Sequence, residues 1–309
     1  MYDSIIILGA TACGKTDISI KLAKKLNTEI INADSLQIYK YLNIGTAKVT
    51  LAEQDGIQHH LLDFVEPTNQ FSVAEYKSMA LPIIKNLISN KKIPIIVGGT
   101  GFYVQSLILD NNYGNSYKSE ELRLKLNQLA QKKGNMEVYK LLENIDPESA
   151  KVIHPNDLKK VIRAIEIYKL SGQKKSELKR TMQTNMQSPI NPLIIVINRN
   201  RDELYDRINK RVDMMVKNGL IDEIKYLINE RHIGKENQCM QAIGYKEFLD
   251  YIDGTIDLSS AIEKVKLNTR HYAKRQLTWF KNQLDALWIN LSETSQEDAI
   301  NIILNAFYQ

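Results

Sequence analysis

Short apolar runs alternate with longer amphipathic stretches along most of the chain. Such runs occur at residues 5–8, 93–97 and 193–197, and shorter ones lie within residues 29–35 and 287–290. Apolar runs of this length indicate strands that are buried on both faces, as in a parallel sheet covered by helices. The stretches between them have the spacing of amphipathic helices. The pattern therefore predicts an α/β fold built on a parallel sheet.

A different pattern occupies the middle of the chain. Residues 115–188 show helical periodicity and no strand pattern. The helices expected there are residues 120–133, 136–144 and 155–170. Turns at Asp146-Pro147 and His154-Pro155 separate them. We therefore expect the chain to be organised as residues 1–114, the first part of an α/β core; residues 115–188, a helical insertion; and residues 189–309, the second part of the core with C-terminal helices.

The glycine-rich stretch after the first predicted strand has the spacing of a phosphate-binding loop, and an amphipathic helix follows it. Its residues, which we expect to bind a diphosphate, are Gly9, Ala10, Thr11, Ala12, Cys13, Gly14, Lys15 and Thr16. Backbone N–H groups of such a loop and the positive end of the helix attract phosphate oxygens. Lys15 adds a mobile positive charge, and the Thr16 hydroxyl is placed to reach Mg²⁺. The motif does not identify the molecule that carries the two phosphates.

Polar residues follow two other predicted strands. Asp34 comes after the second strand, and because ligands bind at the carboxyl ends of parallel strands, we expect it to face the phosphate loop. A structural Asp that caps a turn is the alternative. The strand ending at Val97 runs into Gly98-Gly99-Thr100-Gly101 rather than into the magnesium-binding Asp usual in kinases and ATPases. This weakens a nucleotide hydrolase or kinase interpretation and leaves Asp34 as the best-placed carboxylate.

The distribution of charge indicates a polyanionic partner. The chain has a formal net charge of +5, yet residues 115–187 alone hold 15 Lys or Arg and 9 Asp or Glu, a net of +6, and the rest has −1. A basic helical segment of this kind is typical of a surface that contacts a nucleic-acid backbone. A solvated helical face rich in lysine is the alternative.

Two arginines in the second half are candidates for the phosphate site. Arg207 and Arg211 are four residues apart on a predicted helix and therefore share one face. They form either a surface ion-pair row or a pair of guanidinium groups directed at the phosphates, and the spacing does not decide between these. Further along, residues 241–246 form a short glycine turn that leads into a helix.

These motifs together closely resemble the tRNA dimethylallyltransferases, over nearly the whole chain and in order. The segments that carry the resemblance are residues 9–16, 34–39, 43–48, 98–100, 154–157 and 273–279. Cys13 stands where the family commonly has a serine. Without the zinc-finger extension of eukaryotic members, the chain is similar to the bacterial form. The resemblance implies a phosphate-loop core and transfer of a dimethylallyl group from dimethylallyl diphosphate to N6 of the adenosine 3′ of a tRNA anticodon.

The resemblance also implies residue roles. Asp34 resembles the general base, with Thr100 beside it, and Lys15, Thr16 and Arg207 resemble the residues that handle diphosphate and Mg²⁺; which of Arg207 and Arg211 holds the diphosphate stays open. The residues that it implies as tRNA contacts are Asp34, Ser35, Leu36, Gln37, Thr100, Arg123, Lys159, Lys160, Arg163, Gln241, Gly244, Tyr245 and Lys246. The implied partners are the tRNA anticodon stem-loop and dimethylallyl diphosphate, with no obligate protein partner.

Alternative functions remain at this stage. They are a phosphate-loop kinase of a small metabolite, an enzyme that prenylates free adenylates, and a non-catalytic RNA-binding module that uses a nucleotide as a switch. No signal peptide or membrane span is predicted, because the longest apolar runs have the length of strands. Two cysteines cannot form a disulfide framework, so a reducing cytoplasm is expected.

Overall fold

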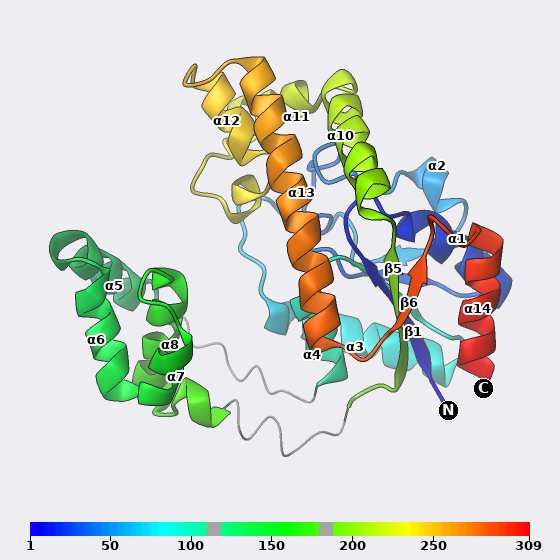
Figure 1. Ribbon diagram of the computed structural model, residues 1–309, viewed down its shortest axis with the longest axis horizontal. Helices are drawn as coiled ribbons and strands as arrows, with labels where there is room; N and C mark the ends of the chain where they lie inside the picture. Colours follow the sequence, from blue (N-terminus) through cyan, green and yellow to red (C-terminus); the bar gives the residue numbers. More distant parts are fainter. Residues whose placement is uncertain (110–118, 179–187) are drawn as a thin grey trace. The chain divides into compact units, whose positions relative to one another are not determined.

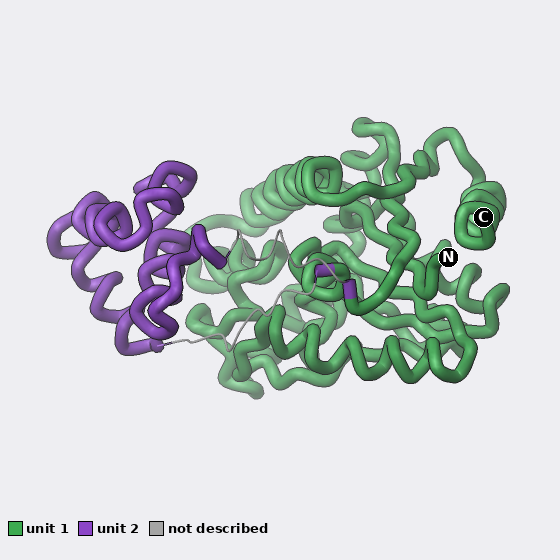
Figure 2. Tube along the Cα trace, turned by 90° about the horizontal axis from the view of Figure 1, so that it is seen from below, with its two compact units in different colours: residues 1–108, 189–309 green, residues 109–188 purple. Residues whose placement is uncertain are grey.

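The computed structural model describes residues 1–109, 119–178 and 188–309 of the 309-residue chain. The chain divides into two compact units, which are coloured separately in Figure 2. Unit 1 comprises Met1–Ile108 and Pro189–Gln309, and unit 2 comprises Leu109–Ser188. The first boundary expected from the sequence, between residues 114 and 115, lies outside the described residues.

Unit 1 is built on a six-stranded sheet in which every pair of neighbouring strands is parallel (Figure 1). The strand order is β3-β2-β4-β1-β5-β6. The strands are β1 (Ser4–Gly9), β2 (Ile30–Asn32), β3 (His59–His60), β4 (Ile95–Gly98), β5 (Pro192–Asn198) and β6 (Leu287–Asn290). The predicted α/β fold with a parallel sheet is confirmed.

The unbroken apolar run of β1 follows from its central position in the sheet. Ile5 and Ile7 pack into a core that contains residues of α1 (Lys15–Leu26) and α14 (Gln296–Tyr308). Ile6 and Leu8 point to the opposite face, where the core contains residues of α3 (Val73–Ser89) and α4 (Gly101–Ile108). Because successive residues of a strand face opposite sides, a strand covered on both faces needs apolar residues throughout.

A third core in unit 1 joins helices of the second half of the chain to residues 38–42. The helices beyond β5 are α10 (Arg201–Lys217), α11 (Leu220–Asn229), the 3-10 helix η1 (Gln238–Gln241), α12 (Lys246–Ile252) and α13 (Leu258–Gln283); the short α2 (Leu51–Gln54) lies earlier. Tyr39, Tyr245 and Phe248 are buried in this core. It fixes the loop after β2 against the C-terminal helices.

Unit 2 is helical where it is described, as predicted. Its helices include α5 (Glu120–Lys133), α6 (Asn135–Ile145), α7 (Pro147–Val152) and α8 (Leu158–Ser171), and they share a core of their own. Asp146 and Pro147 separate α6 from the next helix, as predicted, but that next helix, α7, was not predicted: Asp146 caps it and Pro147 occupies its first turn. Helix α8 begins at Leu158 rather than at Pro155 because Asp157 is its N-cap.

Within residues 1–109, 119–178 and 188–309, no helix is both long and apolar enough to cross a membrane.

Candidate functional site

The phosphate loop follows β1 and has a backbone that requires glycine at two points. Gly14, the N-cap of α1, has φ 105°, a left-handed conformation that glycine adopts without a Cβ clash. A Cβ on Gly9 would collide with the Ile197 carbonyl oxygen of β5 and with the Cys13 sulfur. Gly14 is therefore required by the backbone conformation of the loop, and Gly9 by the close packing of the loop against β5.

Lys15 lies inside the loop. Its Nζ donates hydrogen bonds to the carbonyl oxygens of Gly9, at 3.0 Å, and Ala10, at 2.8 Å. The ammonium group is thus enclosed by the loop whose N–H groups attract phosphate. Lys15 also lines a large cavity together with Thr11 and Thr16.

This cavity has a volume of about 1180 Å³ and is formed wholly by residues of unit 1. The segments that line it are the phosphate loop, the ends of β2 and β4, residues 43–50, part of α10, the 241–244 turn and part of α13. The carboxyl ends of β1, β4 and β2 lie side by side in the sheet order. The expectation that Asp34 faces the same cavity as the phosphate loop is therefore confirmed.

Asp34 both lines the cavity that it shares with the phosphate loop and caps a turn, so the two interpretations of this residue hold together. Its Oδ1 accepts hydrogen bonds from the backbone N–H of Leu36, at 2.9 Å, and of Gln37, at 3.4 Å, which is a turn cap. Its backbone N–H donates to Asn32 Oδ1, which anchors it at the end of β2. Its Oδ2 accepts no hydrogen bond from the described residues, so one carboxylate oxygen stays available in the cavity.

Thr100 connects β4 to the Asp34 turn. Its Oγ1 accepts a hydrogen bond from the Ser35 backbone N–H, at 2.9 Å, and donates to Ser35 Oγ, at 3.1 Å. The neighbouring Gly98 and Gly99 line the cavity, and protein atoms also lie close to the glycines on both sides of Thr100. A Cβ on Gly98 would collide with the Ala33 backbone, and one on Gly101 with the Trp279 ring. The glycines thus serve the close packing that holds Thr100.

Gln276 also belongs to this site. It lies in one of the segments that carry the family resemblance, but the sequence predicted no role for it. The side chain is 7% exposed. Its Nε2 donates to the Gly99 carbonyl oxygen, at 2.9 Å, and its Oε1 accepts from the Thr11 backbone N–H, at 3.2 Å. One amide on α13 therefore joins the phosphate loop to the turn after β4.

The two arginines of α10 have different surroundings. Arg207 donates through Nε to the Ala12 carbonyl oxygen, at 2.9 Å, and does not line the cavity. Arg211 lines the cavity with an exposed side chain, and the protein atoms around it lower the pKa of its guanidinium group. A guanidinium keeps its proton in proteins, so Arg211 is a cation that faces an open volume. Arg199, which the sequence analysis did not single out, also holds the loop by donating to the Cys13 carbonyl oxygen at 2.9 Å.

The residues of unit 1 expected to contact tRNA fall into two groups. Ser35, Leu36, Gln37, Gln241 and Gly244 line the cavity. Tyr245 is fully buried, and its hydroxyl donates to Glu223. It can therefore affect a bound ligand only indirectly, by supporting residues that contact the ligand. Lys246 has a half-exposed side chain and lies 3.7 Å from Glu247.

In unit 2 the residues expected to contact tRNA differ in whether their side chains already form ion pairs within the protein. The carboxylate of Glu166 is fully buried and accepts hydrogen bonds from Arg123 and Arg163. The two arginines lower the pKa of this carboxyl despite its burial, so both support the fold of the unit. Lys160 pairs with Asp157 at 2.5 Å. Lys159 is exposed and has no ion-pair partner among the described residues.

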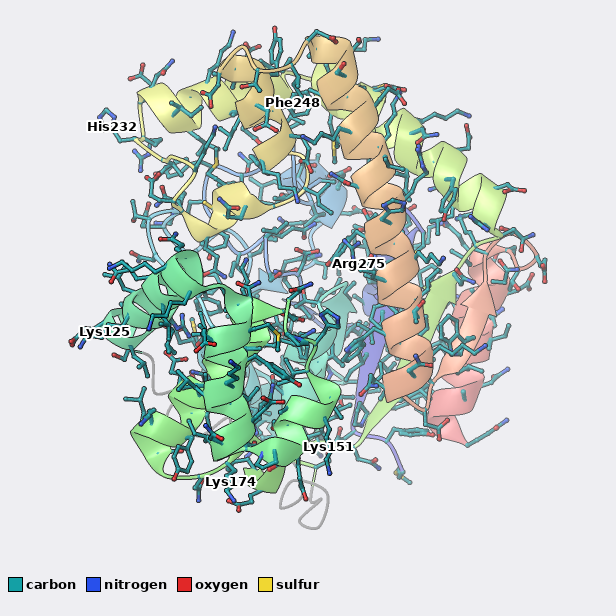
Figure 3. The ribbon with its side chains drawn as sticks, turned by 60° about the vertical axis from the view of Figure 1, so that its left-hand side comes forward. Lys125, Lys151, Lys174, His232, Phe248 and Arg275 are labelled. Carbon is teal, nitrogen blue, oxygen red and sulfur yellow. The ribbon has the colours of Figure 1, made fainter. Side chains whose placement is uncertain are left out.

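Other lysines of unit 2 add to its positive surface. Lys125 and Lys151 lie on helices and Lys174 lies in the turn after α8, and all three are labelled in Figure 3. Lys125 pairs with Glu121 at 2.6 Å and Lys174 lies 3.7 Å from Glu177. These are solvent-exposed pairs, which contribute little to stability and leave the long-range positive potential of the unit in place.

Comparisons with known proteins agree with this geometry. The family model described as IPP transferase matches residues 37–283. A tRNA dimethylallyltransferase of Alkaliphilus oremlandii is 47% identical over 304 residues, which cover 98% of this chain and 96% of that protein. One of Thermoanaerobacter sp. is 46% identical over 278 residues, which cover 90% of this chain and 88% of that protein.

Solved structures give the same answer. The tRNA isopentenylpyrophosphate transferase from Bacillus halodurans is 42% identical with a TM-score of 0.74, and the match covers 100% of this chain and 96% of that one. A eukaryotic dimethylallyltransferase, described as acting on tRNA, is 31% identical with a TM-score of 0.85, over 100% of this chain and 80% of that one. The fold, the phosphate loop and these matches lead to one conclusion: the chain belongs to the IPP transferase family.

Proposed function

We propose that this chain transfers the dimethylallyl group of dimethylallyl diphosphate to N6 of the adenosine 3′ of a tRNA anticodon, position 37, and releases diphosphate. The observation that carries the proposal is the shared cavity, in which a phosphate loop and a carboxylate with one unengaged oxygen line the same volume. A phosphate loop alone fits many nucleotide enzymes. A carboxylate facing it from the end of β2 supplies the base that a nucleophilic amine needs.

The proposed reaction is a substitution at carbon. A bond forms between adenine N6 and C1 of the dimethylallyl group, while the bond between C1 and the diphosphate oxygen breaks and the electron pair leaves with the diphosphate. The amine proton passes to Asp34, for which its Oδ2 is available. Positive charge and backbone N–H groups around the departing diphosphate stabilise the charge that develops there. Lys15 and the N-terminus of α1 supply part of this field.

We assign contact with the diphosphate to Arg211 and support of the loop to Arg207. The first assignment is supported by the position of Arg211 in the cavity wall, where its charged side chain is exposed to the open volume. The second is supported by the hydrogen bond from Arg207 to the Ala12 carbonyl oxygen. A bound diphosphate would accept charge-assisted hydrogen bonds from this guanidinium.

Magnesium is part of the proposal. Mg²⁺ at phosphate sites is bound by few protein oxygens and keeps several waters, so it needs no cluster of carboxylates. The described residues contain no group of three or more His, Cys, Asp or Glu suited to a metal ion. Thr16 lines the cavity, and its hydroxyl makes no hydrogen bond with the described residues, which fits a role as ligand. When bound, Mg²⁺ would supply positive charge to the diphosphate.

RNA binding is assigned to both units. A base in an anticodon loop leaves its stack at low cost, and loop bases are recognised when they are splayed out rather than through a helical groove. We assign Ser35, Leu36 and Gln37, with the 241–244 turn, to the loop bases. Lys159, Lys160 and the basic surface of unit 2 are assigned to the phosphate backbone. A cytoplasmic location is also proposed, because both cysteines are free and buried.

One experiment separates this function from its rivals. The protein is incubated with labelled dimethylallyl diphosphate and Mg²⁺, and with bulk tRNA, with AMP or with no acceptor. Label in tRNA at a single adenosine supports the proposal. Label in AMP indicates an enzyme that prenylates free adenylates. Tight nucleotide binding with unaltered RNA indicates a non-catalytic module, and rapid release of phosphate from ATP indicates a kinase or ATPase.

A further inference from the structure

The carboxylate of Glu223, on α11, accepts hydrogen bonds from the backbone N–H groups of three consecutive residues in a loop distant in sequence. Its Oε2 accepts hydrogen bonds from Asn43, at 2.9 Å, and Ile44, at 2.7 Å, and its Oε1 accepts from Gly45, at 3.1 Å. Three successive N–H groups that converge in this way form an anion-binding concavity in the backbone. Here the anion is a side chain of the same protein, and it fastens the loop to α11.

The same carboxylate also receives the Tyr245 hydroxyl, which donates to Oε1 at 2.8 Å. Tyr245 is fully buried, and a Cβ on Gly45 would lie 2.5 Å from its ring. The tyrosine ring thus packs against the loop backbone at a position that only glycine permits. Glu223 therefore joins the loop of residues 43–48 to the 241–244 turn, and both of these line the cavity.

The fastened loop in turn orients Gln37. Gln37 Nε2 donates to the carbonyl oxygens of Thr46, at 3.2 Å, and Ala47, at 3.1 Å. Its Oε1 accepts no hydrogen bond from the described residues. The amide is therefore held with its two donor hydrogens engaged and its carbonyl oxygen available, an acceptor suited to an amino or imino hydrogen of a base.

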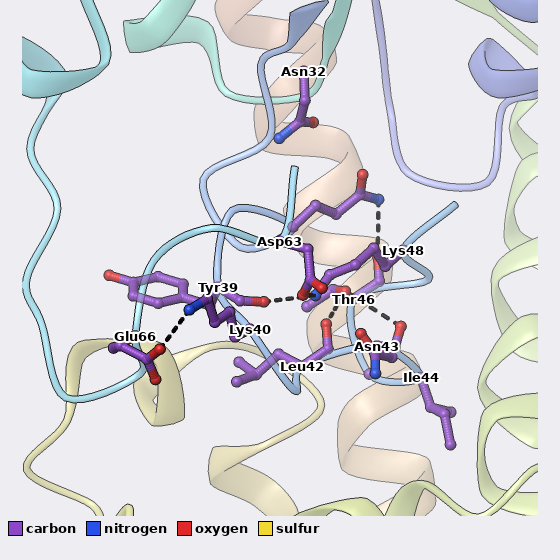
Figure 4. Close-up of polar contacts among 12 residues, drawn as sticks. Asn32, Tyr39, Lys40, Leu42, Asn43, Ile44, Thr46, Lys48, Asp63 and Glu66 are labelled. Carbon is purple, nitrogen blue, oxygen red and sulfur yellow. Dashed lines mark hydrogen bonds and ion pairs between the residues drawn. The ribbon is translucent and has the colours of Figure 1, made fainter. Parts of the chain in front are cut away.

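The second half of the loop is held by hydrogen bonds to residues outside it. Thr46 Oγ1 donates to the Leu42 carbonyl oxygen at 2.7 Å, and Lys48 Nζ donates to the Tyr39 carbonyl oxygen at 2.6 Å (Figure 4). Lys48 also pairs with Asp63 at 2.5 Å. These contacts hold Thr46 and Lys48, whereas the N–H groups of residues 43–45 are held by Glu223.

We propose that Glu223 is a positioning residue for RNA recognition: it fixes the 43–48 loop and the 241–244 turn so that Gln37 presents its carbonyl oxygen to a base. The inference rests on the proposed function, because it concerns the RNA side of the same cavity. Glu223 touches neither reacting group. The diphosphate side is held by other contacts, through Arg207, Arg199 and Gln276, and is independent of Glu223.

The test compares three variants with one matched control. Glu223→Ala removes all four acceptor contacts, Glu223→Gln turns an amide N–H₂ towards loop donors, and Tyr245→Phe removes one donor. The control is Asp222→Asn, which removes a charge from the neighbouring, exposed position of the same helix turn. Each is assayed with an anticodon stem-loop, with stem-loops that carry one substituted base, and with inorganic pyrophosphate as a binding probe.

We expect Glu223→Ala to raise KM for the stem-loop at least tenfold and to reduce discrimination between native and base-substituted stem-loops. The dissociation constant of pyrophosphate should stay within twofold of wild type. Glu223→Gln should lie between Glu223→Ala and wild type, Tyr245→Phe should show a smaller change in the same direction, and Asp222→Asn should match wild type. A general structural defect would instead weaken pyrophosphate and RNA binding together. If Glu223→Ala does not fold, Glu223→Gln and Tyr245→Phe decide.

The outcomes separate the inference from the function beneath it. Wild-type transfer, with equal KM and equal base discrimination in Glu223→Gln and Asp222→Asn, overturns the role of Glu223 and leaves the proposed function intact. An equal loss of pyrophosphate and RNA binding in the Glu223 variants also overturns it. Absence of transfer by the wild-type protein overturns the proposed function itself, and the inference with it.

Discussion

The side-chain amide of Gln276 donates a hydrogen bond of 2.9 Å to the carbonyl oxygen of Gly99, across 177 residues of sequence. The other end of the same amide accepts a hydrogen bond from the Thr11 backbone N–H. From Gly99 the chain passes directly to Thr100, which bonds to Ser35 beside Asp34. A continuous set of contacts therefore links the phosphate loop to the proposed base, and Gln276 is its buried centre.

We expect Gln276→Met to lower kcat about tenfold, because it leaves one buried N–H and one carbonyl oxygen unpaired and loosens the spacing between leaving group and base. Binding of the tRNA stem-loop should change little. Gln283→Met, at an exposed position of the same helix, is the control. Single-turnover rates and a separate RNA-binding measurement check the prediction. A kcat equal to that of the control would show that the link has no effect on chemistry.

Replacing Asp34 by Asn should abolish transfer while RNA binding stays nearly intact. Asn keeps the Oδ1 acceptor that caps the turn over Leu36 and Gln37, but it cannot take the amine proton. Loss of a positioned base typically costs roughly 10² to 10⁴ in rate. Transfer of labelled dimethylallyl groups and stem-loop binding, measured on the same preparation, check this. Full activity of the variant would exclude Asp34 as the base.

The fold was predictable from sequence where the physics is local. The apolar run at residues 5–8 and the glycine spacing at residues 9–16 each depend on neighbours in sequence, and the predicted strand and the predicted loop that leads into a helix are both confirmed. Asp34 could be placed because strand ends of a parallel sheet share one edge. Gln276, Arg199 and Glu223 could not be found in this way, since the loop backbone atoms that they bind lie between 177 and 265 residues away.

Sequence also could not separate the two arginines of α10. A spacing of four residues puts Arg207 and Arg211 on one helix face, but only the packing of that face against the loop gives them different partners. The short helix α7, which begins at Pro147, was missed for a related reason. A proline after an Asp marks either a turn or the first turn of a helix, and the residues that follow decide.

The arginine assignment can be tested directly. We expect Arg211→Gln to weaken binding of inorganic pyrophosphate by about tenfold or more, because it removes a charge from the cavity wall. Arg207→Gln should weaken it less, since its guanidinium holds the Ala12 carbonyl oxygen. The control is Arg201→Gln, because the Arg201 guanidinium lies over the Tyr205 ring on the same helix. Calorimetric titration with pyrophosphate gives the three affinities, and a larger loss in Arg207→Gln would reverse the assignment.

The role of the basic surface in unit 2 can be tested through its salt dependence. Changing Lys159 and Lys160 together to Ala should weaken tRNA binding and reduce the slope of log affinity against log salt by about 2, one unit for each phosphate contact. Lys132 and Lys133 changed together remove equal charge from the exposed end of α5 and should leave the slope near wild type. Equal slopes for the two double variants would indicate diffuse attraction without a defined contact surface.

The stability of unit 2 should depend on pH through Asp146. Its buried carboxylate accepts four hydrogen bonds from the backbone and hydroxyl groups of Ser149 and Ser176, which lower its pKa to about 2. Because this folded-state pKa lies below the ordinary value of 3.8, the contribution is complete above about pH 4 and is lost as the pH falls towards 2. Asp146→Asn should therefore destabilise the unit by about 2 kcal/mol at pH 7.

Both tryptophans, Trp279 and Trp288, lie in unit 1, so tryptophan fluorescence does not report on the unfolding of unit 2. Hydrogen exchange of peptides within residues 138–152 is therefore the measurement for this site. Exchange of wild type and Asp146→Asn is compared at the same pH, because intrinsic exchange rates change with pH. The protection ratio between them should be large at pH 7 and should shrink steadily between pH 4 and pH 2. A ratio that stays constant over that range would mean that Asp146 acts through its shape and hydrogen-bonding capacity alone, and that its charge contributes nothing to the fold of the unit.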